Sequence, residues 1–175
     1  MKNVIYQIVG GKVTVDSIES FMAAINEFNT KHSIFIQVFN AEMICGKIHL
    51  QSAVEHALRA LEQQRMSTQS LQMEILLYAS GERQLKHAIP KVGVKEGEGH
   101  IAILFLKESA TKQSLNEDIN LFIKTFHVKR DDSLLNISKS KIQHWGFSKK
   151  EIQTINTESY EDLILEKIAI VDIIK

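Results

Sequence analysis

The apolar positions of this chain alternate between short continuous runs and helical spacings. Residues 3–9, 33–39 and 100–106 are runs of β-branched, aromatic and aliphatic side chains, which predict three strands. Gly10 and Gly11 predict a turn after the first run, and the apolar character of the second run predicts a central strand. Apolar residues at helical spacing lie between these two runs, after a capping-box pattern at Asp16 and Glu19. A strand, a helix and a strand with short links favour parallel neighbouring strands.

Helical spacing recurs along the rest of the chain. It predicts helices over residues 47–65, 115–126 and 133–145, and a helix from about Ser159 onward, although residues 168–174 also suit a strand. Ser148, with Glu151 at the capping-box spacing, predicts another short helix. Residues 127–130 suit a short edge strand. Together these elements predict an α/β fold, in which a small mixed β-sheet is covered by several α-helices. At 175 residues, without repeats or linkers, the chain is expected to form one domain over residues 1–175.

The stretch at residues 67–93 stands apart from these amphipathic segments. Ser70 and Gly81 are good caps for a helix whose residues are apolar on nearly every face, so this helix must be buried in the core or under a partner. A second helix is predicted from Glu82 to Gly93, with inward and outward faces. Its inward residues are Leu85, Ala88 and Ile89, and its outward basic stripe is Arg83, His87 and Lys91, with Lys86 and Lys95 nearby.

The net charge of the chain bears on whether this basic stripe could bind nucleic acid. Lys+Arg and Asp+Glu both number 21, so the chain has no overall positive field of the kind that attracts nucleic acid. A phosphate contact therefore has to come from a local patch such as this stripe. The same pattern is also typical of a solvated helix face.

Known catalytic and metal-binding patterns are missing from the sequence. The glycines do not form a phosphate-binding loop, and the single cysteine, Cys45, is typical of a small buried side chain. His49 and His56 share a helix face but have no matching carboxylate or cysteine ligands. We therefore expect no enzyme, no cofactor and no metal site. Without a signal peptide or an apolar run of membrane-spanning length, we expect a cytoplasmic protein.

Residues 70–94, SLQMEILLYASGERQLKHAIPKVGV, resemble the signature of the smallest subunits of the KEOPS complex, the PRPK-binding protein family, in its archaeal form. The matching residues are Glu74, Ser80, Gly81, Arg83, Gln84, Leu85, Ala88, Ile89 and Gly93. The segments IFIQVFNAEMICG, HLQSAVEHAL and EKIAIVDI are similar to the family as well, so the resemblance covers essentially the whole chain.

The resemblance implies a function. KEOPS makes threonylcarbamoyladenosine next to the anticodon of transfer RNAs, and its small subunit has no activity of its own. That subunit binds the small atypical kinase that acts as an ATPase, and through it the transferase and scaffold subunits. It also helps to recruit transfer RNA through the single-stranded 3′ CCA end.

Two sets of residues follow as expectations from the resemblance and the patterns together. The expected kinase-binding residues are Leu71, Ile75, Leu76, Tyr78, Ile168 and Ile174, and replacing Ile75 with Glu is expected to abolish binding with the fold intact. The expected RNA-binding residues are Arg83, Lys86, His87, Lys91 and Lys95, with Tyr78 as a candidate for base stacking. The alternative is a stand-alone small-molecule-binding or regulatory domain that forms a homodimer. A homodimer depends on concentration, whereas a KEOPS small subunit is expected to stay monomeric until its kinase is added.

Overall fold

The computed structural model describes residues 4–174, without the side chain of Ile174, so the predicted strand residue Asn3 lies outside it. The described chain forms two compact units. The first comprises residues 4–41 and 94–134, and the second comprises residues 42–93 and 135–174. The single domain over residues 1–175 stays a prediction.

The first unit is a sheet with helices on one face. Within residues 4–174 the sheet has four strands in the order β2-β3-β1-β4: β1 (Val4–Val15), β2 (Phe35–Asn40), β3 (Gly97–Glu108) and β4 (Lys129–Arg130). This confirms the α/β class and the short edge strand. However, every described pair is antiparallel, so the sheet is not mixed in strand direction. β3 lies between β1 and β2, so those two are not the parallel neighbours that the sequence favoured, and β2 is an edge strand rather than a central one.

The predicted turn at Gly10 and Gly11 is also wrong, because β1 continues through both glycines to Val15. A Cβ atom on Gly11 would lie 2.5 Å from a methyl carbon of Val128 and 3.2 Å from the carbonyl oxygen of Lys129. Glycine therefore lets the chain around β4 approach the strand closely, which is its second common use besides turns.

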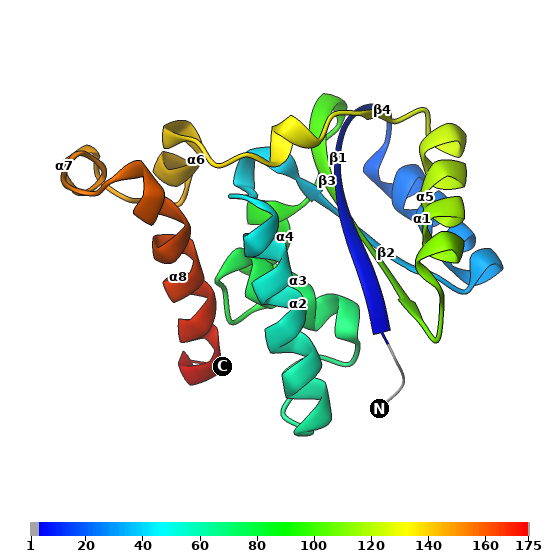
Figure 1. Cartoon of the computed structure of the whole chain (residues 1–175), viewed down its shortest axis with the longest axis horizontal. Helices are drawn as coiled ribbons and strands as arrows, with labels where there is room; N and C mark the ends of the chain where they lie inside the picture. Colours follow the sequence, from blue (N-terminus) through cyan, green and yellow to red (C-terminus); the bar gives the residue numbers. More distant parts are fainter. Residues whose placement is uncertain (1–3, 175) are drawn as a thin grey trace. The chain divides into compact units, whose positions relative to one another are not determined.

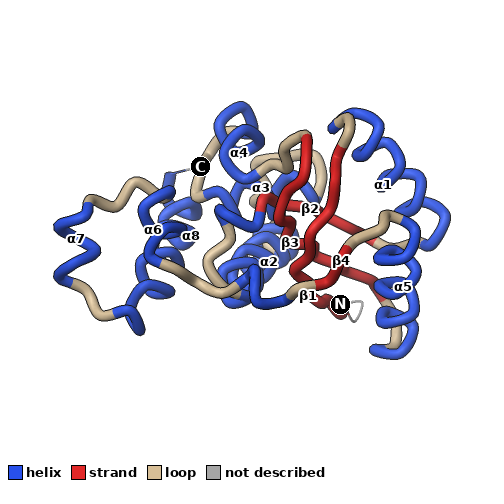
Figure 2. The backbone as a smooth tube through the Cα atoms, turned by 90° about the horizontal axis from the view of Figure 1, so that it is seen from above, coloured by secondary structure: helices blue, strands red, loops and turns tan. Residues whose placement is uncertain are grey.

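Helices α1 (Ile18–His32) and α5 (Lys112–Thr125) pack on the same face of this sheet (Figure 2). Ser17, rather than the predicted Asp16, caps α1 by accepting a hydrogen bond from the backbone N–H of Ser20. The aromatic rings of Phe28, Phe105 and Phe122 meet edge to face between helices and sheet. The apolar residues that these helices cover include Val9, Val13, Ile25, Phe28, Ile36, Val38, Ile101, Ile103, Phe105, Leu115, Ile119 and Phe122.

The second unit consists of helices. They are α2 (Lys47–Glu62), α3 (Leu71–Ser80), α4 (Leu85–Val92), α6 (Lys139–His144), α7 (Lys149–Thr154) and α8 (Tyr160–Ile174). α2, α3 and α8 lie side by side (Figure 1), and α4 packs on α3. The capping box of Ser148 and Glu151 and the C-terminal helix are confirmed. None of the helices within residues 4–174 is long and apolar enough to cross a membrane.

One predicted helix is divided in two. Instead of a continuous helix over residues 133–145, the chain forms a 3-10 turn at Asp132–Leu135 and then α6. Ser138 begins α6 because its hydroxyl accepts a hydrogen bond from the N–H of Lys141. A good capping residue inside an apolar periodic segment therefore started a new helix.

α3 is the centre of the second unit, as its all-round apolar character predicted. Ser70 caps its first turn and Gly81 closes it with a left-handed conformation, φ 66°, so both predicted caps are confirmed. Every residue from Glu74 to Ser80 is buried. An unbroken run of buried positions requires cover on all sides, which α2, α4 and α8 supply in part.

α4 differs from its prediction at both its start and its orientation. It begins at Leu85 rather than Glu82, since Gln84 has the extended backbone of a capping residue. Ile89 is 51% exposed rather than inward, whereas Ala88 and Val92 are buried. Pro90 lies within this helix, where it removes one backbone donor near the end, and the helix stops after Val92.

Candidate functional site

Most of the residues predicted to bind a kinase lie in the core of the second unit. Ile75, Tyr78 and Ile168 are fully buried and Leu76 is 4% exposed, while Leu71 is half-buried. The side chain of Ile174 lies outside the described part. A buried side chain presents no surface to a partner in this conformation, and a glutamate at position 75 would place an unpaired carboxylate in the core. We therefore expect Ile75→Glu to destabilise the fold rather than leave it intact. A role for these residues in partner binding stays a prediction.

A different set of apolar side chains at the same helices is exposed. On α8, Ile170 is 39% and Ile173 is 82% exposed, and Met73 in the first turn of α3 is 36% exposed. α8 buries Ile164, Ile168 and Val171, which leaves Ile170 and Ile173 off the buried stripe. The helical period of the C-terminal segment separates these two stripes in the sequence, but it does not tell which of them is buried.

The directions of the helices place Met73 near the exposed end of α8. The hydroxyl of Tyr78 donates a hydrogen bond to Asp172, and a Cβ on Gly81 would lie 3.7 Å from the carbonyl oxygen of Lys167. α3 therefore runs antiparallel to α8, so its first turn lies toward the C-terminal end of α8. These apolar side chains, Met73, Ile170 and Ile173, are called the α3–α8 surface below.

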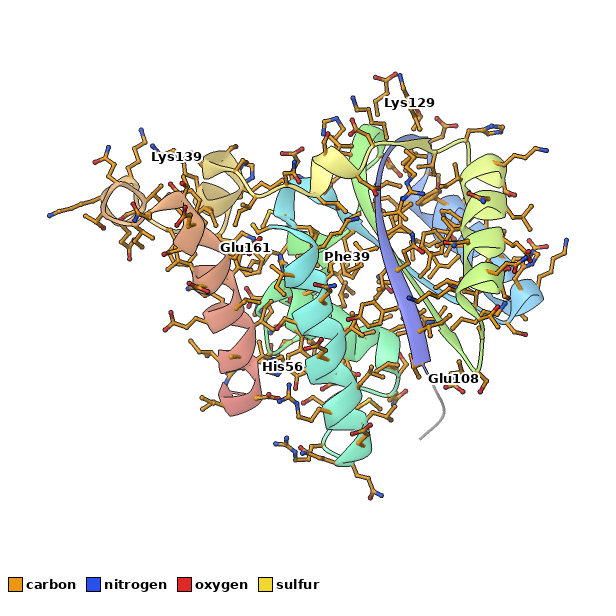
Figure 3. The ribbon with its side chains drawn as sticks, viewed as in Figure 1. Phe39, His56, Glu108, Lys129, Lys139 and Glu161 are labelled. Atoms are coloured by element: carbon orange, nitrogen blue, oxygen red, sulfur yellow. The ribbon has the colours of Figure 1, made fainter. Side chains whose placement is uncertain are left out.

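Asp172 holds this end of α8 against its neighbours. Besides the hydroxyl of Tyr78, its carboxylate contacts Nδ1 of His56 on α2 at 2.7 Å, and His56 points toward α8 in Figure 3. Burial, and then the hydrogen bond to Asp172, raise the pKa of Tyr78 above its ordinary value of 10.0, so the phenol keeps its proton. The three side chains therefore position the last turn of α8, next to Ile173.

The loop before α3 is held by a buried carboxylate. Glu74 is fully buried, and its Oε2 accepts hydrogen bonds at 3.0 Å from the backbone N–H groups of Ser67 and Thr68 and at 2.9 Å from the Thr68 hydroxyl. Charge-assisted bonds of this kind are stronger than neutral ones. Glu74 therefore fixes the loop that leads into the first turn of α3, which carries Met73.

The predicted basic stripe is only partly brought together. Arg83, Lys86 and His87 are exposed in the second unit. Lys91 is half-buried, since its ammonium lies 2.9 Å from a carboxylate oxygen of Glu82 and 4.3 Å from the ring centre of Trp145. Arg83 precedes the start of α4, so the stripe is not one continuous helix face.

Two further residues predicted to bind RNA, Lys95 and Tyr78, are not part of the basic stripe in the structure, for different reasons. Lys95 belongs to the first unit, which is described separately. Tyr78 is fully buried, so its ring is not a surface on which a base could stack in this conformation.

The histidines and the cysteine have structural partners. Nδ1 of the buried His49 accepts a hydrogen bond from the N–H of Cys45 at 3.0 Å, and Nε2 donates to the carbonyl of Ala79 at 2.8 Å. Burial lowers the pKa of His49 to about 4 and raises the pKa of the Cys45 thiol to about 12. A protonated, buried thiol is a poor nucleophile. Within residues 4–174, no three His, Cys, Asp or Glu side chains are placed to hold a metal ion.

Comparison with known proteins gives two matches. Residues 14–172 match the family described as kinase binding protein CGI-121. The chain is also 29% identical over 139 residues to the regulatory protein Cgi121 of Methanocaldococcus jannaschii, which covers 79% of this chain and 84% of that protein. The region matched by the family includes parts of both units, and of the α3–α8 surface it includes Met73 and Ile170 but ends one residue before Ile173.

Proposed function

Because this chain belongs to the CGI-121 family of kinase-binding proteins, we propose that it is a non-catalytic regulatory subunit that binds the small atypical kinase of KEOPS. Through this kinase it joins the transferase and scaffold subunits that make threonylcarbamoyladenosine in transfer RNA. The buried Cys45 and His49 are consistent with a subunit that performs no chemistry itself.

One observation carries the kinase-binding proposal, namely the exposed apolar side chains of the α3–α8 surface. Ile173 is 82% exposed at the end of a helix whose other side is in the core. Exposed apolar side chains at the ends of neighbouring helices are typical of surfaces that partners cover. Of the predicted kinase-binding residues, the half-buried Leu71 belongs to the same first turn of α3 as Met73, whereas Ile75, Leu76, Tyr78 and Ile168 are buried in the helices that carry this surface.

A matched pair of variants tests this assignment. Gly46 lies beside Glu161, since a Cβ there would be 3.1 Å from Oε1, and His56 pairs with Asp172, so α2 and α8 run parallel. Ile48, which is 37% exposed, therefore lies level with the first turn of α8, near Leu163, and Ile173 lies ten residues further along, about 15 Å at 1.5 Å per residue. Ile173→Glu and Ile48→Glu thus place the same charge at opposite ends of one helix pair.

The measurement is calorimetric titration of the purified kinase with each variant. We expect Ile173→Glu to weaken binding by about 10-fold or more, because an interface has to bury the new carboxylate without a partner. Ile48→Glu should bind like the wild type. Both variants should keep the circular dichroism spectrum and melting midpoint of the wild type. If both bind the kinase with wild-type affinity, the docking surface lies elsewhere.

The second part of the proposal is recruitment of transfer RNA through its single-stranded 3′ CCA end by Arg83, Lys86 and His87, with Lys91 contributing charge. The expected role of Lys95, which belongs to the first unit, stays a prediction. Cations along the phosphates are the usual grip on single strands. The test is titration of the protein into fluorescent transfer RNA, with and without the unpaired tail, at two salt concentrations. We expect tail-dependent binding that weakens with salt, with a log–log slope of about −0.7 per phosphate contact. Binding that is insensitive to salt, or equal without the tail, would contradict this part.

A further inference from the structure

Two pairs of an aromatic ring and a lysine flank Gly81 in the second unit. The ammonium of Lys91 lies 4.3 Å from the ring centre of Trp145, and that of Lys167 lies 5.2 Å from the ring centre of Phe147. A Cβ on Gly81 would lie 3.1 Å from the ring of Trp145 and 3.7 Å from the carbonyl oxygen of Lys167. The turn after α3, the segment after α6 and the middle of α8 therefore meet at one place.

The two rings differ in what they can contact. Trp145 is 6% exposed, and its Nε1 donates a hydrogen bond to the carbonyl of Met43 at 3.0 Å, so it is a structural residue. Phe147 lies only two residues further, between α6 and α7, where Gly146 takes a left-handed conformation with φ 85°. Its side chain is half-buried, and Lys167 beside it is exposed. Phe147 is therefore an aromatic ring that is partly packed against the protein and partly accessible to solvent.

Basic residues lie on both sides of the segment that carries this ring. Lys167 of α8 lies over Phe147 itself, and Lys91 of α4, which also pairs with Glu82, lies over Trp145 two residues earlier. Arg83 follows Gly81, which lies against Trp145, by two residues. Single-stranded nucleic acids are bound by this combination, in which cations contact phosphates and an aromatic ring stacks on a base. An ammonium beside the ring adds a favourable contact with the π system.

We propose that Phe147, with Lys167, is the platform on which an unpaired base of a single-stranded RNA end stacks, while Arg83 and Lys86 contact the neighbouring phosphates. This inference rests on the proposed RNA-binding function and assigns the aromatic residue that the basic stripe lacks. Tyr78, the only aromatic candidate from the sequence, is buried beneath α8 and hydrogen-bonded to Asp172.

The test combines a protein variant with a change in the RNA. Phe147→Leu keeps an apolar side chain of similar volume but removes the ring, and Phe147→Tyr keeps the ring. Each variant is titrated into fluorescent transfer RNA whose unpaired 3′ nucleotides carry their bases, or are replaced one at a time by abasic ribose phosphate. A melting curve and a kinase titration confirm that each variant is folded.

With the normal tail, we expect Phe147→Leu to lose about 5- to 150-fold in affinity, the range for one stacked base, and Phe147→Tyr to bind like the wild type. One abasic tail should weaken the wild type by a similar factor, and on that tail Phe147→Leu should bind no worse than the wild type. The salt slope should be unchanged in Phe147→Leu but smaller in Arg83→Ala, because only the second removes a phosphate contact.

The outcomes separate this inference from the function on which it rests. If the wild type binds the tail but Phe147→Leu binds equally well, RNA recruitment stands and the assignment of the platform is wrong. If Phe147→Leu loses as much affinity on every abasic tail as it does on the normal tail, the ring contacts none of these bases and the assignment is again wrong. If the wild type does not bind the tail at all, both the platform and the RNA-recruitment proposal fail.

Discussion

His49 should make this protein sensitive to mild acid. Its ring is fully buried, with Nδ1 accepting from the N–H of Cys45 and Nε2 donating to the carbonyl of Ala79. This arrangement requires the neutral ring, since a proton on Nδ1 would face another donor. The nearby cations Lys141 and Lys91 also disfavour a charged ring, although burial is the main reason that the pKa is lowered to about 4.

The sign and size of the effect follow from the two pKa values. The folded state holds the pKa of His49 at about 4, against 6.5 for an ordinary histidine, so the unfolded chain binds this proton more tightly. The stabilisation is complete above pH 6.5 and is lost as the pH falls from 6.5 toward 4. At pH 5 the expected loss is about 2 kcal/mol, and below pH 4 it approaches about 3 kcal/mol, at 1.36 kcal/mol per pKa unit.

The assay is urea denaturation followed by circular dichroism at pH 7.5, 6, 5 and 4.5, for the wild type and His49→Gln. A glutamine side chain offers one acceptor and one donor but does not become protonated in this range. Whatever its stability at pH 7.5, the variant should lack the extra loss of about 2 kcal/mol at pH 5. Asp131 and Glu151, whose pKa values are lowered by hydrogen bonds to Ser133 and Ser148, contribute equally to both proteins. Parallel losses of stability in the two proteins would refute the reasoning.

Three further outcomes test the packing. Ile75→Ala should lower the free energy of unfolding by about 2–5 kcal/mol in urea denaturation, because Ile75 is fully buried, and a loss below about 0.5 kcal/mol would show that the site is exposed. Gly11→Ala should lower the free energy of unfolding by about 1–3 kcal/mol, since its Cβ would lie 2.5 Å from Val128. Gly99→Ala should be near neutral, because a Cβ at Gly99 would have no atom within 4 Å. Equal effects of the two variants would contradict the close approach at β4. Cys45 should react with a thiol reagent only as fast as the protein unfolds, because the thiol is buried with a pKa of about 12, and rapid labelling of the native protein would contradict this.

Local patterns predicted those features of the second unit that depend on neighbours in sequence. Ser70 and Gly81 cap α3, and Ser148 and Glu151 form a capping box, because each of these contacts joins residues only a few positions apart. The same reasoning failed where a distant segment decides. Gly11 looks like a turn residue in the sequence, but its role depends on Val128, which is more than a hundred residues away.

The same limit applies to the candidate site, where local patterns identified the helices but not which of their side chains are buried and which are exposed. The sequence identified α3 and the C-terminal helix as too apolar for a single amphipathic face, and it identified the basic residues that follow Gly81. It could not distinguish the buried Ile75 from the exposed Ile173, because both are isoleucines in apolar helices. The structure made that distinction through Asp172, whose contacts with Tyr78 and His56 set the rotation of α8 and so leave Ile173 exposed.

The sequence by itself therefore determined most of the elements, the caps of α3 and α7 and the family, since these depend on local chemistry and on the order of residues. Only the tertiary structure decided the antiparallel strand order, the burial of the predicted kinase-binding residues and the meeting of Phe147, Lys167 and Gly81. Each of these depends on which distant segments pack together, and burial and strand pairing are properties of that packing rather than of any one segment.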